Sequence, residues 1–270
     1  MRERTGNVAA EAREAFAAWI SESDDGRVFG EVRIEKDGSG YSIRHIEDEG
    51  GENLDVSTDP TDAREISRFT ESGEYRPLKS SPNLRRRWEL RLSGEAALVS
   101  AMNYFYPAGA VHWHLDREGE LETTSFRENA SRQSGMYERA KHLSDEAAQN
   151  AAKACCEDDV CLKKTLWDID DDTPLEAERG DGEIPCPEPC SVFVSFARRV
   201  RSFEKEEIYA DSDGLTPSEK EDIAALVDGA ASGGVSFARE AEFEEPVNER
   251  RMRYRRLTLA PKLRPEGESG

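Results

Sequence analysis

The sequence predicts an α+β fold in which a small mixed or antiparallel sheet packs with several helices. Two short segments alternate apolar and polar side chains on either side of a glycine-rich turn, which is typical of a β-hairpin. Three other segments repeat apolar residues at helical spacing, at residues 9–20, 97–105 and 193–203. All five cysteines lie between Cys155 and Cys190. We therefore expect a cysteine-ligated cluster between helix ends in the C-terminal half.

The N-terminal part is predicted to contain a helix, a hairpin and a second helix. The apolar stripe of the first helix, within residues 1–26, is formed by Ala9, Ala12, Phe16, Trp19 and Ile20. The hairpin strands are 28–34 and 41–46, and one face of the first strand is expected to carry Val28, Gly30, Val32 and Ile34. Residues 63–69 are interpreted as a short helix, 88–92 as a strand, and 95–106 as a helix that ends before Pro107.

Residues 73–88 form a strongly basic segment in an acidic chain. Its cationic residues are Arg76, Lys79, Arg85, Arg86 and Arg87. One interpretation is a surface loop with ordinary ion pairs. The other is a carboxylate-binding wall, because arginine holds a carboxylate through two parallel hydrogen bonds.

Residues 110–115 are predicted to form a strand that places His112 and His114 on one face. Two imidazoles in this arrangement are able to bind a metal or to move protons, and the simpler interpretation is a pair on a half-exposed face. Residues 121–126 are expected to return as a second strand. Arg127 and Arg132 follow near the start of another helix, and they have the same two interpretations as the first basic segment.

The cysteine block is expected to combine two helix ends. A helix over residues 145–154 should end at Cys155 and Cys156. The prolines around Cys186 disfavour a helix until Cys190, after which residues 191–205 again show helical spacing. A helix that begins at Cys190 would direct its free N–H groups and its dipole toward an anionic cluster.

Four thiolates suit either zinc or an iron–sulfur cluster. Zinc ribbons usually carry two C-x2-C knuckles, whereas this chain has C-x5-C followed by C-x3-C. That spacing also resembles the cluster motif of sulfite and nitrite reductases, although the flanking sequence does not. Wider loops fit a 4Fe-4S cluster better, so we expect it to be held by four of Cys155, Cys156, Cys161, Cys186 and Cys190. Zinc and thiols without metal are the alternatives.

Cys155 and Cys156 compete for the fourth ligand position. Adjacent residues at a helix end point about 100° apart, so only one of them is expected to reach the cluster. The C-x5-C spacing slightly favours Cys155, and C-x4-C from Cys156 is the alternative.

The composition limits the class of protein. With 57 acidic and 37 basic side chains, the chain has a net charge of −20. Such acidity is typical of proteins from a high-salt cytoplasm, and it disfavours nucleic-acid binding. The sequence shows no apolar stretch long enough for a membrane span and no signal-peptide pattern, so we expect a cytoplasmic protein. A reducing cytoplasm also disfavours disulfides.

Toward the C-terminus, residues 216–219 form a capping box that should begin a helix. Residues 249–262 are interpreted as a last strand, and residues 265–270 as a disordered tail. We expect an N-terminal α+β part at residues 1–107 and an iron–sulfur part at residues 108–264, unless both belong to one domain.

Four segments together resemble a known family. They are residues 73–88 (GEYRPLKSSPNLRRRW), Tyr104-Phe-Tyr-Pro107 with Val111-His-Trp-His114, residues 126–135 (FRENASRQSG), and the cysteine block. They resemble the C-terminal iron–sulfur extension of some CbiX-type sirohydrochlorin cobaltochelatases, a module that also exists in a stand-alone form. The resemblance covers roughly residues 25–205, and it implies a 4Fe-4S cluster and a place in cobalamin biosynthesis. Residues 1–40 contain no histidine for the histidine–glycine motif of the chelatase core, so we expect that core to be absent.

The resemblance implies a redox or accessory iron–sulfur protein that acts beside a separate cobaltochelatase and an electron donor. The carboxylates of a tetrapyrrole such as sirohydrochlorin would then be held by Arg76, Arg85, Arg127 and Arg132. His112 and His114 would face the ring. The alternative is a non-enzymatic scaffold or sensor with a structural zinc ion or cluster, and a third hypothesis is metal insertion by the two histidines.

Overall fold

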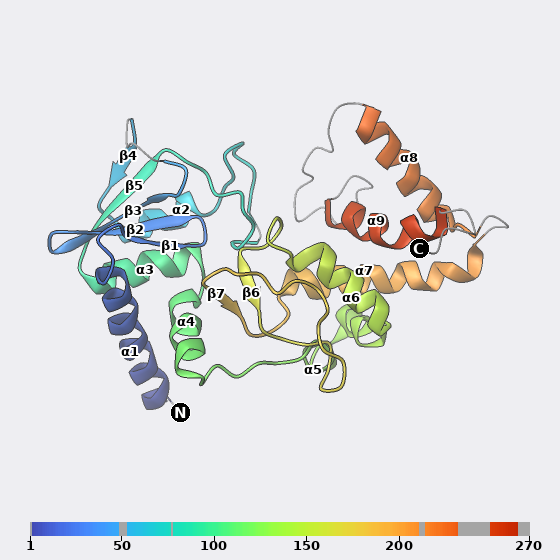
Figure 1. Cartoon of the computed structure of the whole chain (residues 1–270), viewed down its shortest axis with the longest axis horizontal. Helices are drawn as coiled ribbons and strands as arrows, with labels where there is room; N and C mark the ends of the chain where they lie inside the picture. Colours follow the sequence, from blue (N-terminus) through green and yellow to red (C-terminus); the bar gives the residue numbers. More distant parts are fainter. Residues whose placement is uncertain (1, 49–52, 77, 211–213, 232–248, 264–270) are drawn as a thin grey trace. The chain divides into compact units, whose positions relative to one another are not determined.

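The computed structural model describes residues 2–48, 53–76, 78–210, 214–231 and 249–263, whose helices and strands are drawn in Figure 1. The chain divides into two units. Unit 1 comprises residues 1–123, 158–166 and 180–187, and unit 2 comprises residues 124–157, 167–179 and 188–270. The chain therefore changes unit after residues 123, 157, 166, 179 and 187.

Unit 1 is built around a mixed sheet, which confirms the predicted α+β class. Its strands are β1 (Arg27–Phe29), β2 (Val32–Asp37), β3 (Gly40–His45), β4 (Asp55–Ser57) and β5 (Trp88–Ser93), and their order is β1-β2-β3-β5-β4. The β1-β2, β2-β3 and β3-β5 pairs are antiparallel, whereas β4 is parallel to β5. In the predicted hairpin, Ile34 lies opposite Ile43, so the inward positions of both strands are apolar.

The helices of unit 1 pack on this sheet through a mainly aromatic and aliphatic core. They are α1 (Arg2–Ser21), a short 3₁₀ helix η1 (Pro60–Asp62), α2 (Ala63–Ile66), α3 (Glu95–Phe105) and α4 (Gly109–Glu118). The predicted stripe of α1 is confirmed, because Phe16 and Ile20 are fully buried. The ring of Phe16 lies 5.1 Å from that of Phe29 in β1 and 5.4 Å from that of Trp113 in α4. The short helix, strand and longer helix expected over residues 63–106 are likewise present.

The first hairpin strand is interrupted by a turn at Gly30 and Glu31, where the sequence predicted a continuous strand. The common face expected for Val28 and Val32 is wrong, because the turn reverses the side-chain alternation. Val28 is 43% exposed, whereas Phe29 and Val32 are buried. Gly30 adopts a φ of +61°, and a Cβ atom there would lie 2.5 Å from Cζ and Oη of Tyr106.

We expect Gly30→Ala to destabilise unit 1 more than Gly38→Ala. Both glycines have positive φ, which costs an alanine about 1–2 kcal/mol, but a Cβ at Gly38 would meet nothing within 4 Å. The clash with Tyr106 should add about 1–3 kcal/mol to the cost at Gly30. Urea unfolding of both variants measures this difference. Equal free energies of unfolding would contradict the close packing of Tyr106 against Gly30.

Two predicted strands at residues 110–115 and 121–126 are wrong. Residues 109–118 form helix α4, and residues 120–125 are neither helix nor strand. The buried side of α4 consists of Gly109, Ala110 and Trp113, which are spaced as on a helix. Gly119 ends the helix in the left-handed conformation, with a φ of 69°. The alternation from Val111 to Leu115 therefore does not correspond to a strand.

Two short parallel strands complete unit 1. They are β6 (Lys163–Thr165) and β7 (Ile184–Cys186), and Thr165 lies opposite Cys186. Ile184 belongs to the same hydrophobic core as Phe16 and Ile34, and Leu162 packs against that core. Trp113 of α4 donates a hydrogen bond of 3.3 Å from Nε1 to Glu183 Oε2, just before β7. This late part of the chain is therefore integral to unit 1.

Unit 2 is helical in its described residues. Its helices are α5 (Phe126–Ser131), a 3₁₀ helix η2 (Gly135–His142), α6 (Asp145–Cys156), α7 (Ser191–Glu206), a 3₁₀ helix η3 (Glu207–Tyr209), α8 (Pro217–Ala231) and α9 (Glu249–Leu263). The ring of Phe193 in α7 lies 5.4 Å from that of Phe126 and 5.0 Å from that of Trp167. The predicted capping box is confirmed, because Thr216 N–H donates to Glu219 Oε2 at 2.8 Å and Glu219 N–H donates to Thr216 Oγ1 at 3.3 Å.

The last strand expected over residues 249–262 is wrong, because these residues form helix α9. Its inward positions include Arg251 and Arg255, which pair with the fully buried carboxylate of Asp222 at 2.8 and 2.6 Å. The Arg255 guanidinium also lies 4.0 Å from the ring centre of Phe203. Because charged residues occupy inward positions, apolar spacing gives little sign of the helix. The tail predicted at residues 265–270 lies outside the described residues.

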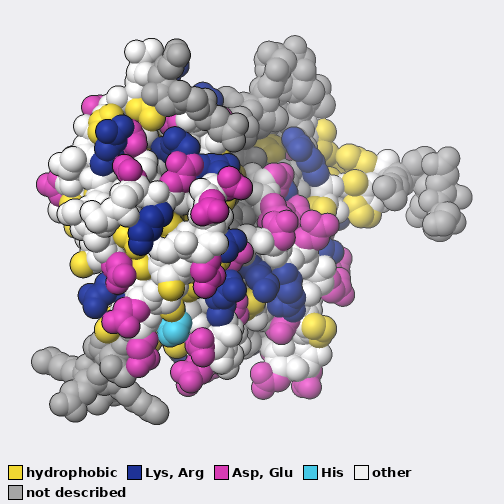
Figure 2. Space-filling model, turned by 60° about the vertical axis from the view of Figure 1, so that its left-hand side comes forward, with side chains coloured by type: hydrophobic (Ala, Val, Ile, Leu, Met, Phe, Trp, Pro, Cys, Tyr) yellow, Lys and Arg dark blue, Asp and Glu magenta, His cyan; other side chains and the backbone are white. Residues whose placement is uncertain are grey.

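The exposed surface reflects the composition. Figure 2 shows one face on which Asp and Glu side chains lie among Lys and Arg side chains, in a chain of net charge −20. Among the described helices, none combines the length and the apolar character that a membrane crossing requires.

Candidate metal centre

In unit 1, Cys161 and Cys186 lie next to the two short parallel strands. Cys161 precedes β6 by two residues, and Cys186 is the last residue of β7. Leu166 N–H donates a hydrogen bond of 3.0 Å to the Cys186 carbonyl, which extends the pairing beyond Thr165. Both thiols are 8% exposed. The strand pair therefore fixes the backbone on which these two sulfur atoms are carried.

The segment around Ser80 contacts the backbone and side chain of Cys161. The Ser80 carbonyl accepts a hydrogen bond of 2.8 Å from Leu162 N–H. Ser80 Oγ lies 3.5 Å from Cys161 Sγ, and Ser81 Oγ lies 3.4 Å from the Val160 carbonyl to which it donates. Both serines are buried. Residues 80–81 and 160–162 of unit 1 are thus joined by three contacts.

Arg76 supports the Ser80 segment from inside the protein. Only 1% of its surface is exposed. Its guanidinium donates to Asn83 Oδ1 at 2.6 Å, Ser81 O at 2.7 Å, Lys79 O at 3.1 Å, Ser67 O at 3.4 Å and Glu31 Oε2 at 3.4 Å. Arg76 was predicted as a carboxylate-binding residue, and the carboxylate it meets is the protein's own Glu31.

Glu31 and Lys79 complete this buried polar cluster. Glu31 Oε2 also accepts Leu84 N–H at 3.0 Å, and the backbone N–H of Glu31 donates to Tyr106 Oη at 2.7 Å. Burial, followed by the charge of Glu31, raises the pKa of Tyr106, so this hydroxyl stays protonated. Burial, together with the positive charges of Arg76 and Arg68, lowers the pKa of Lys79 to about 8.

In unit 2, Cys155, Cys156 and Cys190 lie at the ends of two packed helices. Cys155 and Cys156 are the last residues of α6, and both are buried. Cys190 is the N-cap of α7, and its Sγ accepts a hydrogen bond of 3.4 Å from Phe193 N–H. These positions confirm the predicted helix boundaries. The N-terminal dipole of α7 favours a negatively charged sulfur at Cys190.

The donor set is chemically suited to a soft metal centre. All five cysteines are thiols rather than disulfides, and thiolates are the ligands of iron–sulfur clusters. In the part of the chain that the structure describes, no group of three or more His, Cys, Asp or Glu residues is arranged to hold a single metal ion. The fit to a cluster therefore depends on the type, burial and placement of the thiols within each unit.

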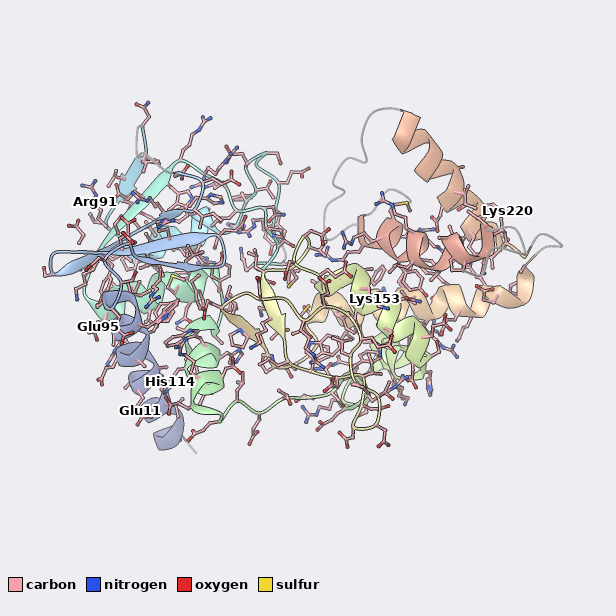
Figure 3. The ribbon with its side chains drawn as sticks, in the orientation of Figure 1. Glu11, Arg91, Glu95, His114, Lys153 and Lys220 are labelled. Atoms are coloured by element: carbon pink, nitrogen blue, oxygen red, sulfur yellow. The ribbon has the colours of Figure 1, made fainter. Side chains whose placement is uncertain are left out.

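The two histidines predicted to share a face do not do so. They lie on helix α4, which runs beside α1 (Figure 3, where His114 is labelled). Residues two apart on a helix are about 200° apart around its axis. His112 and His114 consequently point to different sides of α4, which removes the geometric basis of the predicted imidazole pair.

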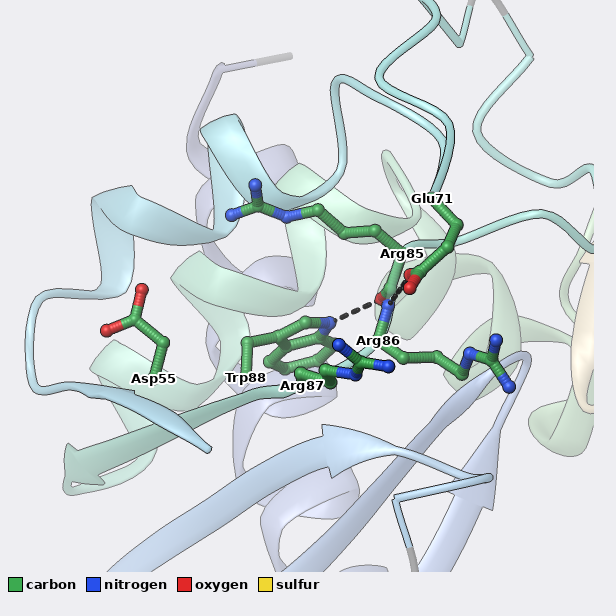
Figure 4. A pocket seen from close by; sticks show the side chains of 6 residues that line it. All are labelled: Asp55, Glu71, Arg85, Arg86, Arg87 and Trp88. Atoms are coloured by element: carbon green, nitrogen blue, oxygen red, sulfur yellow. Dashed lines mark hydrogen bonds between the residues drawn. The ribbon is translucent and has the colours of Figure 1, made fainter. Parts of the chain in front are cut away.

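The other predicted arginines have varied surroundings. In unit 2, Arg127 pairs with Asp145 and Arg132 pairs with Glu128. In unit 1, Arg85 lines a cavity of about 220 Å³ together with Asp55, Glu71, Arg86, Arg87 and Trp88 (Figure 4). In the view of Figure 4, the Arg85 side chain runs above the Trp88 indole, and the Arg86 side chain extends away from it.

Local hydrogen bonds fix the backbone around this cavity. Trp88 Nε1–H donates to the Arg85 carbonyl at 2.6 Å, and Arg86 N–H donates to Glu71 Oε2 at 2.7 Å. Arg87 adopts a φ of +66°, which is uncommon for a residue with a side chain. Its N–H donates to Asp48 Oδ2 at 2.8 Å, which helps to hold that conformation.

Sequence reasoning missed Ser80 and Glu31 as residues that bear on the cysteines. Glu31 lies in the predicted hairpin strand 28–34 and Ser80 in the basic segment 73–88, neither stands out there, and each is recognised only through its buried contacts. The one signal in the sequence is the density of arginine and serine in residues 76–87, which indicates that the segment is specialised without indicating how.

Two family models match the chain. Residues 118–199, which include all five cysteines, match a 4Fe-4S iron-sulfur cluster binding domain. Residues 12–117 match the DR2241 stabilising domain. The first match supports 4Fe-4S binding by this protein, and the boundary between the two matches lies at the end of α4.

The chain is also similar to a solved structure. This is DR2241 from Deinococcus radiodurans, described as a multi-domain protein with structural similarity to chelatases and with two additional novel domains. The sequence identity is 26% and the TM-score 0.63, over 73% of this chain and 42% of that chain. The present chain thus matches less than half the length of its structural neighbour. Comparison with curated proteins gave no match.

Proposed function

We propose that this protein binds a 4Fe-4S cluster through Cys161, Cys186, Cys190 and one of Cys155 and Cys156. The observation that carries the proposal is that residues 118–199 match a 4Fe-4S binding domain and contain every cysteine of the chain. The burial of four thiols and the helix N-terminus at Cys190 support it. Burial would shield a metal–thiolate centre from water, and the helix N-terminus favours its negative charge.

The choice between Cys155 and Cys156 follows from the helix that carries them. Both lie in the last turn of α6, and they point about 100° apart around its axis. One sulfur is therefore a ligand, and the other occupies a neighbouring buried position. The C-x5-C spacing favours Cys155 as the ligand.

A bound 4Fe-4S cluster would supply one-electron transfer. The chain's own residues would set the electrostatic surroundings of the cluster and its access to water. The dipole of α7 and the Phe193 N–H stabilise negative charge at Cys190. Trp167 and Phe193 are almost completely buried beside this helix end, which limits access of water. We infer that the protein is a redox or accessory protein.

We further propose that the protein acts in cobalamin biosynthesis, beside a separate sirohydrochlorin cobaltochelatase and an electron donor. The resemblance in sequence and a neighbour described as structurally similar to chelatases support this pathway. Sirohydrochlorin carries several carboxylates, which arginine binds well. The cavity of about 220 Å³ at Arg85 has room for a carboxylate arm, but is smaller than the pockets of drug-sized ligands.

Anaerobic purification tests the proposed cluster directly. We expect a brown protein with a broad absorption band near about 400 nm and about four irons and four sulfides per chain. Zinc is measured in the same sample. A colourless protein with one zinc ion per chain would overturn the redox proposal and support the alternative, in which the cysteines hold a structural metal in a scaffold or sensor.

Tetrapyrrole binding is tested separately, because the cluster and the pathway are independent claims. Sirohydrochlorin is titrated anaerobically into the protein and into Arg85→Ala, and binding is followed by tetrapyrrole fluorescence. We expect weaker binding by Arg85→Ala than by Arg91→Ala, a control in which an exposed arginine outside the cavity is removed. Equal affinities would remove Arg85 from the proposed site.

A further inference from the structure

We propose that Ser80 donates a hydrogen bond to the Cys161 thiolate and thereby raises the reduction potential of the cluster. The inference rests on the proposed cluster, and it assigns a tuning role to a residue outside the part of the chain that matches the 4Fe-4S domain. Ser80 lies instead in residues 12–117, which match the DR2241 stabilising domain. That region would then influence the metal centre and not only the stability of the fold.

The direction of the hydrogen bond follows from the state of the sulfur. Ser80 Oγ and Cys161 Sγ are 3.5 Å apart, a distance at which either group of the unligated protein is able to donate. A sulfur bound to iron is a thiolate and carries no proton. The serine hydroxyl is then the only donor of the two. The contact is longer than an O–H···O bond because sulfur is a larger acceptor.

The position of Ser80 is determined by contacts on both sides. Arg76 donates to the carbonyls of Lys79 and Ser81, the two residues that flank Ser80. The carbonyl of Ser80 itself accepts Leu162 N–H, from the residue that follows Cys161. Only 2% of Ser80 is exposed, so water does not readily replace the sulfur as its partner. The hydroxyl is therefore held next to Cys161 before any metal binds.

The expected electrochemical effect has a definite sign. A donor beside a cluster ligand stabilises the reduced cluster more than the oxidised one, because reduction adds negative charge that spreads onto the sulfur atoms. Removing the hydroxyl should therefore lower the midpoint potential. Ser81 provides a matched control, since it is also buried and its hydroxyl donates to the Val160 carbonyl.

The experiment compares Ser80→Ala, Ser80→Thr and Ser81→Ala with the wild-type protein. Each is purified anaerobically, its iron content is measured, and its midpoint potential is determined by titration followed by electron paramagnetic resonance of the reduced cluster. In Ser80→Ala we expect the ratio of reduced to oxidised cluster at a fixed potential to fall about tenfold, which corresponds to a shift of 59 mV for one electron. Ser80→Thr and Ser81→Ala should stay close to the wild type.

The outcomes separate this inference from the proposed function. Full iron content with the same potential in Ser80→Ala and Ser81→Ala would overturn the tuning role and leave the cluster intact. If Ser80→Ala does not take up iron, Ser80→Thr decides: a potential close to that of the wild type supports the role of the hydroxyl, and a lowered one overturns it. Wild-type protein that contains no iron would overturn both proposals.

Discussion

Replacing Cys190 by serine is expected to abolish the cluster while leaving helix α7 folded. Cys190 is the N-cap of α7, and its sulfur accepts Phe193 N–H at 3.4 Å. Serine is a strongly preferred N-cap residue, so its hydroxyl should accept the same hydrogen bond. An alcohol is a much poorer ligand for iron than a thiolate. We expect iron to fall from about four per chain to near zero, without loss of helical circular dichroism.

Three further variants make this test specific. Cys190→Ala removes the ligand and the cap together, so it should lose the same iron and be less stable than Cys190→Ser by about 1 kcal/mol. Serine is also placed separately at Cys155 and Cys156, where only one of the two variants should lose the cluster. Retention of four irons by both Cys190 variants would contradict the assignment of this residue as a ligand.

Replacing Arg76 by methionine should destabilise unit 1 by about 3–5 kcal/mol, because it leaves a buried carboxylate without its charged partner. Glu31 lies in the same interior as Arg76, with 8% of its side chain exposed. The change also removes donors from the carbonyls that flank Ser80. Equilibrium urea unfolding of the metal-free protein gives the free energy directly.

Arg86→Met is the matched control for this loss. Arg86 pairs with Glu47 at 2.8 Å, but both side chains are largely exposed, and such a pair contributes less than about 1 kcal/mol. Removing the carboxylate as well, in Arg76→Met with Glu31→Gln, should recover part of the lost stability, since the unpaired carboxylate is then replaced by a neutral amide. A loss at Arg76 no larger than at Arg86 would show that the buried pair does not stabilise unit 1.

The accuracy of the sequence predictions depends on which residues face inward. Helix α7 is predicted well because its inward residues, such as Phe193 and Val200, are apolar and repeat at helical spacing. Helix α9 is missed because Arg251 and Arg255 occupy inward positions and pair with Asp222. Helix α4 is mistaken for a strand because five residues happen to alternate, although its end at Gly119 is a recognisable helix signal.

The candidate site, like the fold, could be predicted only in part from the sequence. The cysteines and their helix ends follow from spacing and from the prolines near Cys186, because these are local properties of the chain. The contact of Ser80 with Cys161 joins residues that are 81 positions apart, and no local pattern encodes it. The buried role of Arg76 was also invisible, since an arginine in a basic segment is more often exposed.

The order in which the units occur along the chain has a consequence for synthesis on the ribosome. Unit 1 includes β6 and β7, so it is incomplete until residue 187 has emerged, although most of its core precedes residue 123. A nascent chain of that shorter length lacks Ile184, and the surface that Ile184 covers stays exposed to water. Translation must therefore deliver the first two stretches of unit 2, residues 124–157 and 167–179, before unit 1 is complete. Unit 1 is therefore completed late in synthesis, and a fragment cut at residue 123 should aggregate more readily than the whole chain.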